Sequence, residues 1–212
     1  RTAAILTAAD QMDASPLQPD SLLSHLGAAD ETVASAVTRI ATRRTEWAEE
    51  IASVFGKWVE RREVIPAQLR SLKAILPAHL NTEPGQALIA RFLEWPDDKD
   101  GEIYLLATEL ITAAPAPKLA ASWKPVLDRE LTNTHPVRLA ATLAAIGKLR
   151  NPKFDPALKG MGSNESLPRI LRVKALASVS SLKGKLDNES MKLLMELLDH
   201  GSSVRDRGEA AR

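Results

Sequence analysis

The strongest indication of the fold lies in residues 136–149, which read PVRLAATLAAIGKL. Apolar residues at every third position, from Val137 to Ile146, share one face of a helix. The same pattern returns 33 residues earlier and 33 residues later, which is typical of a solenoid of stacked helix pairs. The four series are Tyr104, Val137 and Ile170; Ala107, Ala140 and Val173; Leu110, Leu143 and Leu176; and Ala113, Ile146 and Val179.

The composition favours an all-α fold. Of the 212 residues, 44% are apolar and only 4% are aromatic, and alanine and leucine dominate. A β-sandwich would use more β-branched and aromatic residues in alternating runs, and we find no strand–turn–strand signature. The chain has no cysteine, which excludes disulfides and thiolate metal sites but leaves the compartment, cytoplasmic or periplasmic, undecided. No run of about 18 apolar residues is present, so we expect no membrane span.

The repeat pattern predicts one α-α superhelix of roughly five helix pairs. We expect a single solenoid over residues 1–212, irregular in 1–100 and with clear repeats of about 33 residues in 101–212. The chain begins with Arg1 instead of methionine and stops at Arg212 inside an expected helix. We therefore expect a fragment of a longer protein.

Helical periodicity and breakers predict the order of helices along the chain. Asp30 is expected to start a long helical stretch, in which residues 31–63 form one helix or two with a joint near Thr42–Thr45. Two helices are preferred, because a pair fits a repeat. Pro125 is expected to kink its helix. The expected helices are 2–12, 20–26, 30–63, 66–77, 84–95, 103–114, 118–131, 136–149, 156–159, 167–182, 187–198 and 203–212, with a flexible loop at 160–166.

Three steps of an aliphatic residue followed by arginine open the repeated first helices: Val137-Arg138, Leu171-Arg172 and Val204-Arg205. A second helix at 191–199, MKLLMELLD, runs into a turn before the last of these steps. Together these motifs resemble the HEAT-repeat family, clearly over residues 100–212 and weakly before them. The motifs that mark ankyrin and tetratricopeptide repeats are absent.

The resemblance implies two antiparallel helices per repeat, stacked into a right-handed superhelix. It also implies a structural role for Arg138, Arg172 and Arg205, because that arginine commonly supports the turn between repeats in the family. Arrays of this style resemble those embedded in large bacterial multidomain proteins. The resemblance is specific for the fold and nearly silent on activity.

The charge is distributed unevenly between the two halves. Residues 1–114 carry 11 Lys and Arg against 17 Asp and Glu, whereas residues 115–212 carry 17 against 10. Solvated helix faces explain such charges most simply, but a basic half is also compatible with nucleic acid. HEAT-like DNA glycosylases suggest this alternative, with a basic groove that holds a tryptophan and a carboxylate. The basic residues that would contact phosphate are Lys148, Arg150, Lys153, Lys159, Arg169, Arg172, Lys174, Lys183 and Lys185.

No motif in the sequence predicts catalysis, a metal or a cofactor. The acidic run 97–102 fails as a calcium loop, because Pro96 and Ala107 would occupy its first and last ligand positions. The four histidines are scattered, without the spacing of a zinc site. The four tryptophans are expected in the core, and Trp123, beside Lys124, is the candidate binding anchor if it is exposed.

The sequence thus predicts a non-catalytic scaffold that presents a curved helical surface to a protein partner or to a neighbouring domain of the same chain.

Overall fold

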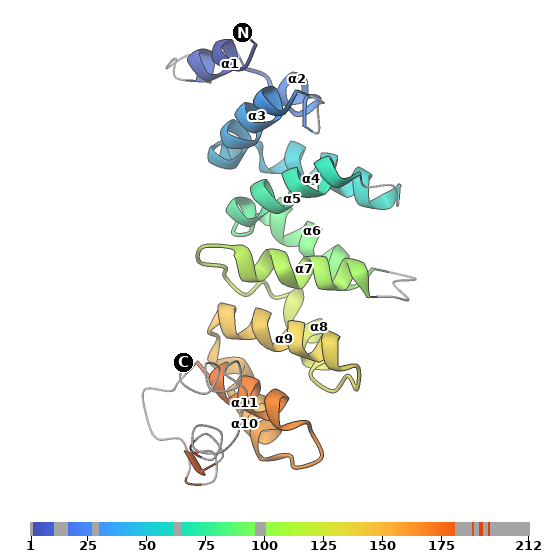
Figure 1. Cartoon of the computed structure of the whole chain (residues 1–212), viewed down its shortest axis with the longest axis vertical. Helices are drawn as coiled ribbons and strands as arrows, with labels where there is room; N and C mark the ends of the chain where they lie inside the picture. Colours follow the sequence, from blue (N-terminus) through green and yellow to red (C-terminus); the bar gives the residue numbers. More distant parts are fainter. Residues whose placement is uncertain are drawn as a thin grey trace. The chain divides into compact units, whose positions relative to one another are not determined.

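The computed structural model describes residues 2–10, 17–26, 30–61, 65–95, 101–180, 188, 191, 192 and 195. Every regular element in these residues is a helix and none is a strand, which confirms the all-α prediction for them (Figure 1). The elements are α1 (Thr2–Asp10), α2 (Pro19–Leu23), α3 (Glu31–Arg43), η1 (Thr45–Trp47), α4 (Ala48–Glu60), α5 (Pro66–His79), α6 (Glu83–Leu93), α7 (Glu102–Ala113), α8 (Trp123–Glu130), α9 (Pro136–Leu149), η2 (Pro152–Phe154), α10 (Asp155–Ser163) and α11 (Arg169–Ala177).

The chain divides into two compact units. The N-terminal unit comprises Arg1–Arg91 and Ala113–Pro115, and the C-terminal unit comprises Phe92–Thr112 and Ala116–Arg212. Each unit has its own buried apolar side chains. One continuous solenoid over residues 1–212 remains a prediction.

In the N-terminal unit, residues 31–63 form two helices, α3 and α4, as preferred from the sequence. Arg44 leaves the helical region at φ −86° and ψ 77°, and the short 3-10 turn η1 follows it. Asp30 starts α3 as predicted, because its carboxylate accepts hydrogen bonds from the N–H groups of Thr32 and Val33 at 2.9 and 3.2 Å.

The core of the N-terminal unit forms where α3 packs against α1 and α5, and where α4 packs against α5. The apolar residues of each helix recur at intervals of three and four, so they line one face. The central side chains, all almost fully buried, are Val37, Ile40, Ile51, Phe55, Val59, Leu72, Ile75 and Leu76.

In the C-terminal unit, α7, α9 and α11 carry the repeated pattern, and α9 packs against α8 and α11 (Figure 1). Leu110, Leu143 and Leu176, which occupy matching positions, are all buried. The first series deviates, because Val137 is 53% exposed whereas Tyr104 is 1% exposed. Val137 lies in the first turn of α9, where the neighbouring Arg138 extends over the Tyr104 ring instead.

The helix expected over 118–131 begins only at Trp123, after a turn in which the Trp123 N–H donates to the Ala120 carbonyl. Pro125 therefore lies in the first turn of α8, where an N–H group has no intrahelical acceptor in any case. The predicted kink at Pro125 was based on a wrong helix start.

The flexible loop expected at 160–166 is wrong in its first part, because α10 continues to Ser163. Gly162 permits a close approach of α11 to this helix. A Cβ atom at Gly162 would lie 2.4 Å from Cδ2 of Leu176, so the two helices pack with almost no space between them.

The last predicted helices are tested only in part. α11 ends at Ala177, before the expected end at residue 182. The helices expected over 187–198 and 203–212 lie outside the described residues, apart from residues 188, 191, 192 and 195. Of the helices that the structure describes, none is both long and apolar enough to cross a membrane.

Candidate interaction surface

Arg138, predicted to support a repeat turn, binds a buried carboxylate across the α8–α9 turn. Its Nε and Nη2 atoms each donate to an oxygen of Glu130 at 3.1 Å, a two-point geometry that suits a carboxylate. The Asn133 side chain donates to Glu130 at 2.7 Å. Glu130 is 5% exposed, so these donors replace the water that the carboxylate loses on folding.

The same arginine joins α9 to α7. Its guanidinium carbon lies 4.3 Å from the centre of the Tyr104 ring, a cation–π contact. The Thr142 hydroxyl donates to the Arg138 carbonyl, so the Tyr104 hydroxyl donates to Thr142 Oγ1, at 2.6 Å. Burial raises the pKa of Tyr104 to about 12, so this phenol stays protonated at neutral pH and has a packing role.

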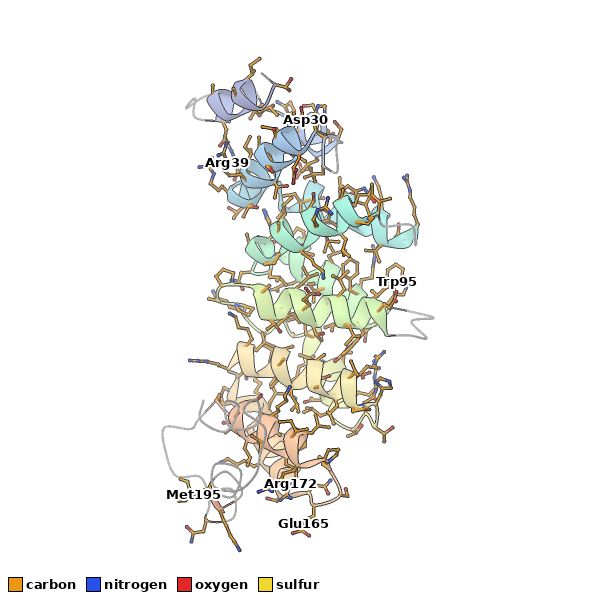
Figure 2. All side chains as sticks on the ribbon, in the orientation of Figure 1. Asp30, Arg39, Trp95, Glu165, Arg172 and Met195 are labelled. Atoms are coloured by element: carbon orange, nitrogen blue, oxygen red, sulfur yellow. The ribbon has the colours of Figure 1, made fainter. Side chains whose placement is uncertain are left out.

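Arg172 joins α11 to α10. Its Nε donates to the Gly162 carbonyl at 2.8 Å, near the C-terminal end of α10. Figure 2 shows Arg172 and Glu165 near the turn that joins these helices. Arg205 lies outside the described residues, so its predicted role is not tested.

Trp123 is not an exposed anchor. Its side chain is 0% exposed, because Trp123, Val126, Leu127 and Glu130 follow one another at helical spacing on the buried face of α8. The anchor hypothesis is therefore wrong, and none of the other three tryptophans is exposed either.

Seven of the nine basic residues proposed to contact phosphate lie in the described part of the chain, all within or beside α9, η2, α10 and α11. They do not surround an exposed tryptophan, which the glycosylase-like alternative would need. Arg150, Lys153, Lys159 and Arg169 are exposed; Lys148, Arg172 and Lys174 are half-buried; Lys183 and Lys185 lie outside the described residues.

Asp155, a buried acid in this region, has a structural role. Its Oδ1 accepts hydrogen bonds from the backbone N–H and the hydroxyl of Ser180, at 2.9 and 3.0 Å. Ser180 follows the end of α11, so this contact joins it to the start of α10. Glu165 is exposed in the turn between the two helices.

His79 is a buried group that the sequence did not single out. Its Nε2–H donates to the Ala41 carbonyl at 2.9 Å, and no described residue bonds to its Nδ1. Burial lowers the pKa of His79, which favours the neutral ring. Among the described residues, no cluster of three acidic, histidine or cysteine side chains could hold a metal ion.

The exposed side of η2 and α10 is basic, and among its described residues none is a large apolar side chain. We call it the basic α10 face and define it by Arg150, Lys153, Pro156, Ala157, Lys159 and Gly160, all of which are exposed.

A comparison of this chain with models of protein families, with curated proteins and with solved structures finds no match.

Proposed function

We propose that the chain is a HEAT-like α-solenoid that acts as a non-catalytic scaffold for a protein partner or for a neighbouring domain of a longer chain. The observation that carries the proposal is that the buried polar groups are hydrogen-bonded within the fold. Glu130, Tyr104, Asp155 and His79 are each bonded to a side chain or backbone group of the fold, and these bonds hold helices and turns together. Because these groups stabilise the packing of the helices, we place the function on the exposed faces of the fold.

Contacts between the first helices of successive repeats, α7, α9 and α11, support the solenoid proposal. The Tyr104 and Thr142 hydroxyls join α7 to α9, and the Ser178 hydroxyl, just after α11, donates to the Leu143 carbonyl of α9 at 3.0 Å. Stacking of each pair on its neighbours is the arrangement expected of a HEAT-like array.

Nucleic-acid binding by a glycosylase-like protein is the second candidate, and the exposed cations between Lys148 and Lys174 favour it. The burial of Trp123 argues against it, since that ring cannot stack on a base without unfolding α8.

Affinity capture tests the scaffold function. The 212-residue chain would be immobilised and exposed to nuclease-treated extract of the cells that produce it, with excess free chain as competitor. We expect defined proteins that the free chain displaces. Binding to a short DNA duplex would be measured in parallel at low and moderate salt. Retention of DNA alone, with affinity that falls steeply with salt, would replace the scaffold with the nucleic-acid function.

A further inference from the structure

Arg150 occupies a backbone conformation that an arginine adopts at a cost. It ends α9 in the left-handed region, at φ 46° and ψ 45°, and among the described residues it is the only non-glycine with positive φ. Glycine is the common residue at such a helix end, because its lack of Cβ removes the steric penalty. The stability of the turn therefore does not explain an exposed arginine at this position. We infer that its guanidinium group has a function.

The turn after Arg150 places a second cation, Lys153, in η2, directly before α10. The Asn151 side chain accepts the N–H of Lys153 at 3.1 Å and so holds the backbone of η2. η2 runs directly into α10, where Lys159 follows. The exposed cations Arg150, Lys153 and Lys159 are thus carried on one short, ordered segment.

These cations have no carboxylate to neutralise them in the described part of the chain. Arg150, Lys153 and Lys159 form no ion pair with a described residue. Between 139 and 180 the two acidic residues are Asp155, which is 7% exposed and bonded to Ser180, and Glu165, in the turn after α10. This positive charge, which no carboxylate in the described ranges offsets, favours an anionic ligand.

The exposed side of α10 also carries residues that are small or apolar. Pro156, Ala157 and Gly160 are exposed, and Gly160 lies four and three residues after the other two, which makes it their neighbour on the surface of α10. A Cβ atom at Gly160 would meet nothing within 4 Å, so this surface is open. Another backbone can approach such a face closely, and apolar side chains can cover it.

An acidic peptide matches this surface better than nucleic acid does. A phosphate backbone would pair with the cations but would gain nothing from Pro156 and Ala157. Unpaired bases would need exposed aromatic rings, whereas the nearby Trp123 and Phe154 are both 0% exposed. Carboxylates next to apolar side chains would satisfy both parts of the face.

We propose that the basic α10 face binds an acidic amphipathic segment of a protein partner, with Arg150, Lys153 and Lys159 pairing with its carboxylates. The assignment rests on the proposed scaffold function and specifies the chemistry of the partner.

The probe is a fluorescent synthetic helix of about 18 residues, with glutamate on one side and leucine on the other. A peptide with glutamine in place of glutamate is its neutral control, and a short DNA duplex is the competing ligand. We expect the 212-residue chain to bind the acidic peptide, to bind the neutral one at least about tenfold more weakly, and to prefer the acidic peptide to DNA. Equal affinity for both peptides, no binding of the acidic peptide, or tighter binding of DNA would overturn the proposal.

Two double variants of equal charge locate the site. Arg150→Gly with Lys153→Gln removes two cations of the face, and Lys57→Gln with Arg70→Gln removes two exposed cations of the N-terminal unit. The first pair should weaken binding of the acidic peptide at least about tenfold, and the second by less than about twofold. Equal weakening would show that only net charge matters. If the Arg150 and Lys153 double variant captures partner proteins as well as the wild type does, the scaffold function is retained, but the basic α10 face is not its binding surface.

Discussion

Nε2 of His79 lies 2.9 Å from the carbonyl oxygen of Ala41, which precedes it by 38 residues. Ala41 belongs to the last turn of α3, where carbonyl groups lack an intrahelical partner. A carbonyl can only accept a hydrogen bond, so Nε2 carries the proton and the neutral ring keeps a bare Nδ1. His79 thus caps α3 from α5 and joins two helices that form the core of the N-terminal unit.

This contact predicts that acid destabilises the N-terminal unit. Burial lowers the pKa of His79 below its ordinary 6.5, against opposing effects of the Ala41 hydrogen bond and of Glu46. As the pH falls the unfolded chain therefore takes up the proton first. The stability is complete above about pH 6.5 and is lost as the pH falls from there through the folded pKa.

The variant His79→Gln keeps a donor for Ala41 but does not titrate. Urea unfolding at about pH 7.5 and about pH 5 should show a larger loss of unfolding free energy in the wild type than in this variant. Equal losses in both proteins would mean that another group causes the acid sensitivity.

Glu130 and Arg138 should be coupled in stability. Glu130→Leu leaves Arg138 without its carboxylate, and Arg138→Met leaves Glu130, which is 5% exposed, without its guanidinium partner, so each should lower the unfolding free energy by about 3 kcal/mol. The double variant Glu130→Leu with Arg138→Met should lose less than the sum, because no buried charge remains. Chemical denaturation of the four proteins measures the coupling. Additive losses would show that the pair does not act as a unit.

Sequence periodicity predicts the apolar faces of the helices well and their ends poorly. Leu110, Leu143 and Leu176 are buried as the repeat indicates, because three-residue spacing alone defines a helix face. The exposure of Val137 depends instead on the contact between Arg138 and Tyr104, which links residues far apart in the chain. Helix ends depend on such contacts, and so the start of α8 was placed too early.

The buried polar groups could not be predicted, for a related reason. His79 and Asp155 bind partners 38 and 25 residues away, and neither lies in a local motif. A histidine or aspartate near a helix end has the same local pattern whether it faces solvent or another helix. Arg138 and Arg172 could be singled out only because the aliphatic-Arg step repeats.

Trp123 should contribute to stability and not to binding. Trp123→Ala removes a fully buried indole and should lower the unfolding free energy by about 4 kcal/mol. Trp123→Phe keeps a buried ring, so it should remain folded and capture the same partner proteins as the wild type. Loss of capture by a phenylalanine variant with near-native thermal stability would restore the anchor role.

Two glycines of α10 should respond in opposite directions to the same substitution. A Cβ at Gly160 meets nothing within 4 Å, whereas a Cβ at Gly162 would lie 2.4 Å from Cδ2 of Leu176. Gly160→Ala should therefore raise the unfolding free energy by about 0.5–1 kcal/mol, because alanine loses less backbone entropy in a helix.

Gly162→Ala should lower the unfolding free energy by about 1–3 kcal/mol, since Leu176 is buried and α11 must shift to make room. Each variant is the control for the other, because both make the same chemical change in the same helix. Thermal and urea unfolding of the pair measures the difference. A stabilising Gly162→Ala would show that α10 and α11 are not packed against each other as closely as the structure has them.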